Sequence, residues 1–161
     1  MRELPKLTIV DGDLLRQEVE VIVNPWSRNV IPYWLLWPRG VSGVIRRAAG
    51  CQPFRELRRH GRLPLGGAAL TTAGRLPFRG IIHVASVGLR WTSSEEAVIL
   101  SVANALALAH GRFISLAFPL IGAGTGGMKP ERVEAIMEEA IGTADFEGEV
   151  RIVRFKPDAP P

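Results

Sequence analysis

Short runs of apolar and β-branched residues recur along the chain, and each run stops at a turn-forming residue. The first covers 7–10 and stops at the Asp-Gly-Asp turn of 11–13, and the second covers 21–23 and stops at Asn24 and Pro25. In the second run the apolar residues are consecutive, which is typical of a strand covered on both faces in a largely parallel sheet. Further runs predict strands at 68–72, 80–85, 113–119 and 150–155.

Other segments repeat their apolar residues with helical periodicity. A helix is predicted from Gly40, with Arg46 and Arg47 off an apolar stripe at Val41, Val44, Ile45, Ala48 and Ala49. Ser93 and Glu96 have capping-box spacing and open a second helix that runs to about 109. A third begins at Pro130, with its buried stripe at Val133, Ile136, Met137, Ala140 and Ile141. The order β β α β β α β α β predicts one three-layer α/β domain over 1–161, with a core at about 7–155 and a tail at 156–161.

Composition narrows the class of protein. A chain of 161 residues that is 47% hydrophobic suffices for one core but not for two domains. Its net charge of +4 permits a phosphate-bearing partner without identifying one. The single Cys51 excludes an intramolecular disulfide and a cysteine cluster for a metal, and no segment reaches the ~18 apolar residues of a membrane span. We therefore expect a cytoplasmic protein with no metal, no cofactor and no membrane partner.

A glycine-rich segment at 122–127 lies between a predicted strand and a predicted helix. Its four glycines let successive backbone N–H groups converge on one point, as in loops that hold phosphate oxygens. A flexible turn is the alternative, although such turns need only one or two glycines. Met128 stands at the lysine position of a Walker loop, and the segment follows the fifth predicted strand rather than the first strand of a dinucleotide-binding unit. Neither standard nucleotide motif fits.

Two further features fall near the same edge of the predicted sheet. A second glycine segment, 40–43, opens the first predicted helix. Because loops at the carboxyl ends of parallel strands share one edge, the two glycine segments are expected to face each other and to suit a diphosphate. Asp13, at the exit of the first strand, fits either a turn or helix N-cap, or an acceptor for a ligand amine.

Five segments, taken in order, resemble the signatures of the macro domain family. They are IVDGDL at 9–14, VEVIVN at 19–24, GVSGVI at 40–45, IIH at 81–83 and AFPLIGAG at 117–124. The resemblance covers about 7–155 and implies a six-stranded mixed, largely parallel sheet between helices. It also implies binding of ADP-ribose, either free or attached to a protein.

The resemblance assigns a role to individual residues. It places Asp13 on the adenine amine, Asn24 beside the terminal ribose, and Phe155 as an aromatic ring against adenine. These roles match the chemistry, because an amine needs an acceptor, a diphosphate needs N–H donors and a base needs an apolar surface. For Phe155 a core position is the alternative. The implied ligand-binding residues are Asp13, Leu14, Asn24, Gly40, Val41, Ser42, Ile121, Gly122, Ala123, Gly124, Thr125, Gly126, Gly127 and Phe155.

Two positions depart from the family's ADP-ribosyl hydrolases. Ser27 and Ser42 stand where those enzymes usually carry an Asn and an Asp, and Asn29 supplies an amide only if the alignment shifts. Serine is a poor base near neutral pH, so binding is the leading function. The alternative is an ADP-ribosyl hydrolase or O-acetyl-ADP-ribose deacetylase. In it, Asn24, Ser27 and Ser42 are the catalytic residues and position a water activated by the ligand's own diphosphate.

Three remaining features each have a second interpretation. The segment 28–39 carries Tyr33, Trp34 and Trp37 and fits a lid over the ribose end or a packing or self-association surface. His83 fits a structural role better than a catalytic one, because no nucleophile with a supporting acid can be paired with it. An arginine cluster fits a solvated helical face, or a second alternative in which the protein binds RNA or a nucleotide phosphate; nucleic acid is not the favoured partner. The cluster comprises Arg46, Arg47, Arg55, Arg58, Arg59 and Arg62.

Overall fold

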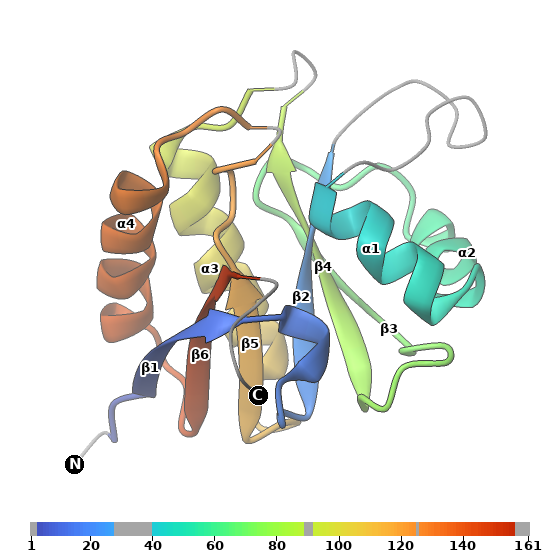
Figure 1. Ribbon diagram of the computed structural model, residues 1–161, viewed down its shortest axis with the longest axis horizontal. Helices are drawn as coiled ribbons and strands as arrows, with labels where there is room; N and C mark the ends of the chain where they lie inside the picture. Colours follow the sequence, from blue (N-terminus) through green and yellow to red (C-terminus); the bar gives the residue numbers. More distant parts are fainter. Residues whose placement is uncertain (1–2, 28–39, 89–91, 125, 157–161) are drawn as a thin grey trace.

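A six-stranded sheet forms the middle layer of the computed structural model, which describes residues 3–27, 40–88, 92–124 and 126–156 (Figure 1). The strands stand in the order β1-β6-β5-β2-β4-β3, and every neighbouring pair is parallel except the antiparallel β3 and β4. This confirms the mixed, largely parallel sheet. The strands are β1 (Lys6–Gly12), β2 (Val21–Ser27), β3 (Ala68–Thr71), β4 (Gly80–Val87), β5 (Ser115–Pro119) and β6 (Glu149–Phe155).

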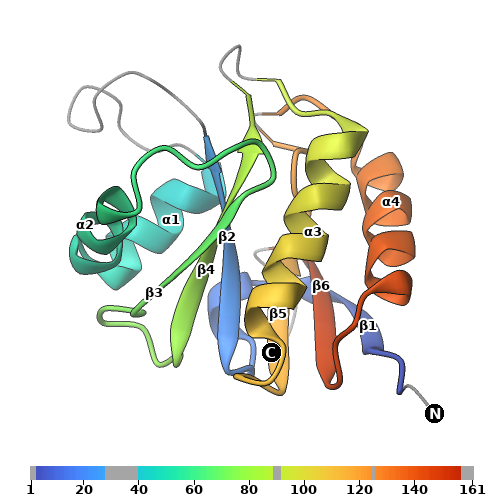
Figure 2. The same cartoon turned by 180° about the vertical axis from the view of Figure 1, so that it is seen from behind.

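Helices cover both faces of the sheet, which confirms the three-layer architecture. Figures 1 and 2 show α1 (Gly40–Ala49) and α2 (Gln52–Arg59) on one face, with α3 (Glu95–Ala109) and α4 (Pro130–Thr143) on the other. A short 3₁₀ helix, η1 (Leu14–Arg16), follows β1 directly. The buried stripe predicted for α4 is confirmed at all its positions, which are Val133, Ile136, Met137, Ala140 and Ile141.

The consecutive apolar residues of β2 explain how the two faces are built. Val21 and Val23 pack into the cluster under α3 and α4, while Ile22 packs into the cluster under α1 and α2. Successive side chains of a strand point to opposite faces, so Asn24 falls on the α1 and α2 side with Ile22. On this face of β2 the apolar Ile22 is therefore followed by the polar Asn24, at the carboxyl end of the strand.

Some element boundaries differ from the prediction. The predicted end of the second strand at Asn24 and Pro25 is wrong, because β2 continues to Ser27. Its pairing with β5 involves only Val21 and Ile22, so beyond Ile22 one side of β2 behaves as an edge, where a proline without an N–H is tolerated. Helix α2 was not predicted, since it buries little besides Phe54 and Leu57 between its charged residues.

Two details of the predicted helices are also corrected. Ser94, rather than Ser93, is the N-cap of α3, and its hydroxyl accepts a hydrogen bond of 3.1 Å from the Ala97 N–H. Val44 was expected in the buried stripe of α1, but it is 43% exposed. The stripe is narrower because α1 packs on the sheet through Ile45 and Ala49.

The turn between β3 and β4 holds the carboxyl end of α1. Arg75 donates hydrogen bonds to the carbonyl oxygens of Arg47, Ala48 and Ala49, at 2.9, 3.4 and 3.0 Å. Gly74 has a φ of +59°, and a Cβ there would collide with the Ala49 carbonyl. These contacts satisfy carbonyl groups that a helix end leaves unpaired. They also fix the helix whose first turn contains the predicted phosphate loop.

Candidate functional site

The topology marks one place in the sheet where a ligand would be expected. Strands β2 and β5 are neighbours, but the chain leaves β2 for α1 on one face and leaves β5 for α4 on the other. Connections that diverge in this way leave room between the carboxyl ends of the two strands, and open α/β sheets bind ligands there. Figures 1 and 2 show the beginning of α1 and the segment after β5 at this same edge.

The glycine segment after β5 folds into a turn closed by its own backbone. The Met128 N–H donates to the Gly122 carbonyl at 3.0 Å, and the Gly127 N–H donates to the Gly124 carbonyl at 3.1 Å. Gly122 and Gly127 adopt φ values of +87° and +75°, which favour glycine. Among the described residues, the N–H groups of Gly122, Gly124 and Gly126 donate to no backbone carbonyl, as expected of N–H groups in a loop that binds an anion.

Ser93 explains why two of these positions are glycine. A Cβ on Gly122 would lie 2.8 Å from the Ser93 hydroxyl, and a Cβ on Gly126 would lie 2.7 Å from the Ser93 Cβ. The Ser93 N–H donates to the Gly126 carbonyl at 3.1 Å, and its hydroxyl donates to the Ser86 carbonyl at 2.7 Å. Ser93 therefore ties the glycine segment to the end of β4. The sequence pointed to Ser93 only as a helix cap, so this role was missed.

The predicted adenine end lies where β1 and β6 finish side by side. Asp13 is the N-cap of η1, since one of its carboxylate oxygens accepts from the Leu15 N–H at 2.9 Å; its other oxygen lies 3.9 Å from the Arg16 Nε. Phe155 is in register with Gly12, next to Asp13, and it is 71% exposed. The alternative of a core position for Phe155 is therefore wrong, whereas the capping role of Asp13 is confirmed. The side chain of Leu14 is buried.

Ion pairs surround this end on the surface. The Lys156 ammonium lies 2.7 Å from an Asp11 carboxylate oxygen, and Arg154 contacts Glu134 through two hydrogen bonds of 2.6 and 2.7 Å. The hydrogen bond from Lys156 lowers the pKa of Asp11, and that from Arg154 lowers the pKa of Glu134. Exposed ion pairs of this kind contribute little to folding stability.

The predicted ribose end is buried and connected by hydrogen bonds. Asn24 is fully buried, and its Nδ2 lies 2.9 Å from the Nδ1 of His83. The Nε2 of His83 lies 2.9 Å from the Thr71 hydroxyl. The Phe54 ring packs edge-on against His83 at 5.4 Å between ring centroids, and Trp26 lies 5.7 Å from Phe54. The structural role of His83 is confirmed, but Thr71 was not anticipated.

Burial decides the charge of His83. Desolvation lowers the pKa of its imidazole to about 3, with a smaller lowering from His60 and an opposing effect of Glu56. The ring is therefore neutral near pH 7. The Asn24 Oδ1 has no hydrogen-bond partner among the described residues, although the atom is buried. An unpaired buried acceptor is costly, and it marks a place where a ligand donor would be favourable.

The remaining site residues are only partly described. Gly40 begins α1 with a φ of +62°, Val41 is half-buried, and the buried Ser42 hydroxyl has no partner in the part of the chain that the structure describes. Ser27 ends β2, but its side chain lies outside the described residues. Thr125 and the segment 28–39, with the predicted lid and Asn29, also lie outside them.

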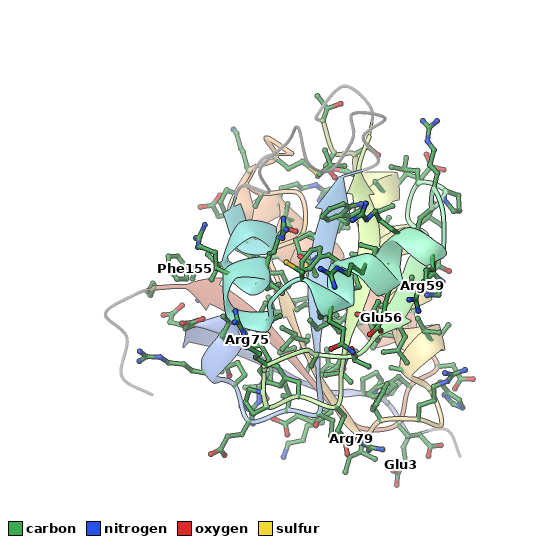
Figure 3. All side chains as sticks on the ribbon, turned by 90° about the vertical axis from the view of Figure 1, so that its right-hand side faces the viewer. Glu3, Glu56, Arg59, Arg75, Arg79 and Phe155 are labelled. Atoms are coloured by element: carbon green, nitrogen blue, oxygen red, sulfur yellow. The ribbon has the colours of Figure 1, made fainter. Side chains whose placement is uncertain are left out.

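Arg59, in the part of the arginine cluster on α2, lies away from the predicted adenine end. In Figure 3, Arg59 and Glu56 lie on the α2 side, while Phe155 stands at the end of β6 beyond α1. Glu56 accepts two hydrogen bonds from Thr72, at 2.9 and 2.7 Å, and the contact with the Thr72 hydroxyl lowers the pKa of Glu56. The side chains of Arg55, Arg58 and Arg59 are exposed, as expected of a solvated helical face.

Other kinds of site are absent from the described residues. No three His, Cys, Asp or Glu side chains in them gather closely enough to hold a metal ion. None of their helices has the length and apolar character needed to cross a membrane. A hollow of about 450 Å³ between β3 and α3 is lined by Leu63, Pro64 and Asn104, among others, and shares no residue with the predicted site.

Comparisons with known proteins support the architecture. The family model described as Macro domain matches residues 24–137. An O-acetyl-ADP-ribose deacetylase of Escherichia fergusonii is 38% identical over 133 residues, which cover 76% of this chain and 70% of that protein. A relative in Aquifex aeolicus is 36% identical over 137 residues, with coverages of 84% and 80%. A relative in Thermotoga maritima is 35% identical over 145 residues, but this chain spans only 23% of that protein.

Solved structures agree with these sequence comparisons. A mutant of the Oceanobacillus iheyensis macrodomain with ADPR matches with a TM-score of 0.75 and 31% identity, over 93% of this chain and 85% of that one. The Trypanosoma brucei macrodomain in complex with ADP-ribose also matches with a TM-score of 0.75, over 93% of this chain and 64% of that one. At 20% identity, this second likeness concerns the fold alone.

Proposed function

The chain belongs to the macro domain family, and on that premise we propose that it binds ADP-ribose, free or attached to protein, at the carboxyl edge of its sheet. The observation that carries the proposal is the divergence of the chain at β2 and β5, with a glycine segment following β5 and α1 beginning at the same edge. Helix N-termini and converging backbone N–H groups are favourable partners for a diphosphate. An O. iheyensis macrodomain solved with ADPR has the same fold at 31% identity.

Each part of ADP-ribose has a partner in this proposal. The diphosphate lies between the first turn of α1, at 40–42, and the segment 121–127. Adenine stacks on Phe155, which is exposed at the end of β6, while its amine donates to Asp13. The terminal ribose lies beside Asn24, whose buried Oδ1 is an acceptor for a hydroxyl group. In this proposal backbone groups bind the diphosphate, and side chains recognise adenine and the terminal ribose.

Calorimetric titration with ADP-ribose tests the proposal. We expect binding by the wild-type protein and a clear loss of affinity in Asp13→Asn. Asparagine is as good an N-cap as aspartate, so this variant keeps η1 while replacing the carboxylate oxygen that does not cap the helix with an amide donor. Glu18→Ala, which removes a nearby exposed carboxylate, is the matched control and keeps the wild-type affinity. No heat at millimolar ADP-ribose would refute the proposed function.

Hydrolysis of an ADP-ribose derivative is the second candidate function. It is favoured by the 38% identity to an O-acetyl-ADP-ribose deacetylase and by two buried polar atoms without a described partner, Asn24 Oδ1 and Ser42 Oγ. In this mechanism the ligand's diphosphate activates a water that Asn24, Ser27 and Ser42 position. Release of acetate from O-acetyl-ADP-ribose, or of ADP-ribose from modified acidic side chains, is the assay. Turnover that survives the double replacement of Ser27 and Ser42 by alanine would contradict these roles.

A further inference from the structure

Three polar side chains form a row across neighbouring strands, on the face covered by α1 and α2. Thr71 on β3, His83 on β4 and Asn24 on β2 are 5%, 0% and 0% exposed. Asn24 and His83 are direct partners in the register of β2 and β4. The row therefore runs inward from β3 to the carboxyl end of β2, where the proposed ligand lies.

Hydrogen-bond donors and acceptors can be assigned along this row from its outer end. The Thr71 hydroxyl donates its only proton to the Thr72 carbonyl at 2.9 Å, so it must accept from the Nε2 of His83. Nε2 therefore carries the ring proton, and Nδ1 presents a lone pair. The Asn24 Nδ2 donates to that lone pair at 2.9 Å, which turns the amide oxygen away from His83.

We propose that Thr71 and His83 are positioning residues that fix the orientation of the Asn24 amide, so that this position presents an acceptor, and not a donor, to the ligand. The inference rests on the proposed function, because the ligand group that it concerns is a hydroxyl of the terminal ribose. A ribose hydroxyl can donate to Oδ1, whereas a ligand without a donor there leaves a buried oxygen unpaired. Sites built in this way discriminate strongly against ligands that lack the matching group.

The surroundings of His83 keep the assignment constant near neutral pH. The edge-on Phe54 ring and full burial exclude water from the imidazole, and its pKa is lowered to about 3. The charged and titratable groups acting on it are His60 and Glu56, whose effects are smaller than that of desolvation. A protonated ring would carry hydrogen on both nitrogens and would force Asn24 to turn its oxygen toward His83. The proposed orientation of the Asn24 amide therefore requires a neutral His83 ring.

The tautomer of His83 can be measured without any ligand or substitution. Long-range ¹H–¹⁵N correlation NMR of the wild-type protein is expected to show His83 as the Nε2–H tautomer. Thr71→Val removes the acceptor of that proton, so the Nδ1–H form becomes populated. Thr71→Ser restores the hydroxyl and with it the wild-type tautomer. A wild-type ring in the Nδ1–H form would overturn the inference whether or not any variant folds.

Binding of ADP-ribose and of ADP, which lacks the terminal ribose, provides the functional readout. In Thr71→Val we expect about a tenfold weaker affinity for ADP-ribose, as for the loss of one hydrogen bond, and an unchanged affinity for ADP. Thr72→Val, which removes the neighbouring hydroxyl that contacts Glu56, is the matched control and changes neither affinity. If Thr71 had a structural role alone, Thr71→Val would lower the affinities for both ligands equally or would lower neither. Either result would overturn the inference.

The two proposals fail in different ways. A wild-type protein that binds neither ADP nor ADP-ribose refutes the proposed function, and the ligand role of Asn24 with it. A wild-type protein that binds both, with the same ratio of affinities in Thr71→Val, refutes the positioning role alone. Recovery of the wild-type ratio in Thr71→Ser, together with its loss in Thr71→Val, supports the inference.

Discussion

Asn24 and Asp13 are assigned to opposite ends of the proposed ligand, and the two side chains differ in how the protein holds them. Asn24 is fully buried and bonded through His83 to a third strand, whereas Asp13 is partly exposed and bonded to a residue only two positions away. At the buried end, ligand recognition and folding stability depend on the same hydrogen bonds. At the exposed end ligand recognition and folding stability can be changed separately, because local contacts and surface ion pairs contribute little to folding stability.

The two ends are expected to differ most in how they make the free energy of unfolding depend on acid pH. The unfolded chain binds a proton at His83 below its ordinary pKa of 6.5, whereas the folded protein does so only near its pKa of about 3. Between these values the unfolded state binds more protons, so the free energy of unfolding falls by up to about 1.4 kcal/mol per pH unit as the pH drops. Urea unfolding between about pH 6.5 and pH 5 measures this slope.

The exposed end behaves differently in the same experiment. The pKa of Asp11 is lowered from 3.8, chiefly by its hydrogen bond with Lys156, so its contribution is present above that value and is lost only in stronger acid. His83→Gln is the matched control and should flatten the slope above pH 5. An equal slope in this variant and in the wild type would show that His83 is not the acid-sensitive group.

Substitution of Asn24 is expected to have the next largest effect, on both the free energy of unfolding and the ligand affinity. Asn24→Ala leaves the lone pair of the buried His83 Nδ1 without a donor, and we expect a loss of about 1–3 kcal/mol in the free energy of unfolding. ADP-ribose affinity should fall by at least about tenfold, while ADP affinity stays the same. Calorimetry and urea unfolding on one preparation provide both values.

Asn104→Ala is the control for that substitution. The Asn104 side chain donates to the Gly66 carbonyl at 2.7 Å, outside the proposed site. Its removal should also lower the free energy of unfolding, but it should leave the ADP-ribose affinity unchanged. Equal effects of the two substitutions on affinity would remove Asn24 from the ligand site.

The glycine segment lies between the two ends, and two of its positions differ in the space around them. A Cβ on Gly126 would lie 2.6 Å from the Gly122 carbonyl oxygen, whereas a Cβ on Gly124 would meet no atom of the described residues within 4 Å. Gly126→Ala must therefore displace the turn, and we expect about a tenfold loss of affinity for ADP and ADP-ribose alike. Gly124→Ala keeps both affinities within about twofold. Calorimetry with both ligands that finds the two variants alike would refute the proposed role of this segment.

The smallest effect on the fold is expected at Phe155. It is 71% exposed, so Phe155→Ala should change the free energy of unfolding by less than about 0.5 kcal/mol. Loss of the ring that stacks on adenine should still lower the affinities for ADP and ADP-ribose by about threefold to tenfold. Ile114, equally exposed at 71% before β5, is the matched control. If Ile114→Ala weakens the nucleotides as much, stacking on Phe155 is not the cause.

The sequence predicted the sheet well because its apolar runs are long enough to show burial on both faces. It missed α2, whose two apolar residues, Phe54 and Leu57, are too few to show a helical period. It also ended β2 at Pro25, because the sequence does not reveal that β5 stops pairing with β2 after Ile22. Strand partners and register are tertiary properties, and the end of a strand depends on them.

The same limit applies to the candidate site. The glycines, Asp13 and Asn24 stood out by spacing and resemblance, but Thr71 did not, since its contact with His83 depends on the register between β3 and β4. Ser93 was assigned to a helix cap because the pattern of serines and glutamates around 93–96 allows two starting points. The hydrogen bond from the Ala97 N–H to the Ser94 hydroxyl and the packing of Ser93 against Gly126 distinguish them.

The central claim, that the ligand lies at the carboxyl edge of the sheet, is tested most directly by mapping backbone amide NMR shifts during titration with ADP-ribose. We expect the largest changes at Asp13 and Leu14, at Asn24, at 40–42, at 121–127 and at Phe155, with α2 unaffected. Saturable changes confined to the arginines of α2, at Arg55, Arg58 and Arg59, or no changes at millimolar ligand, would contradict the account.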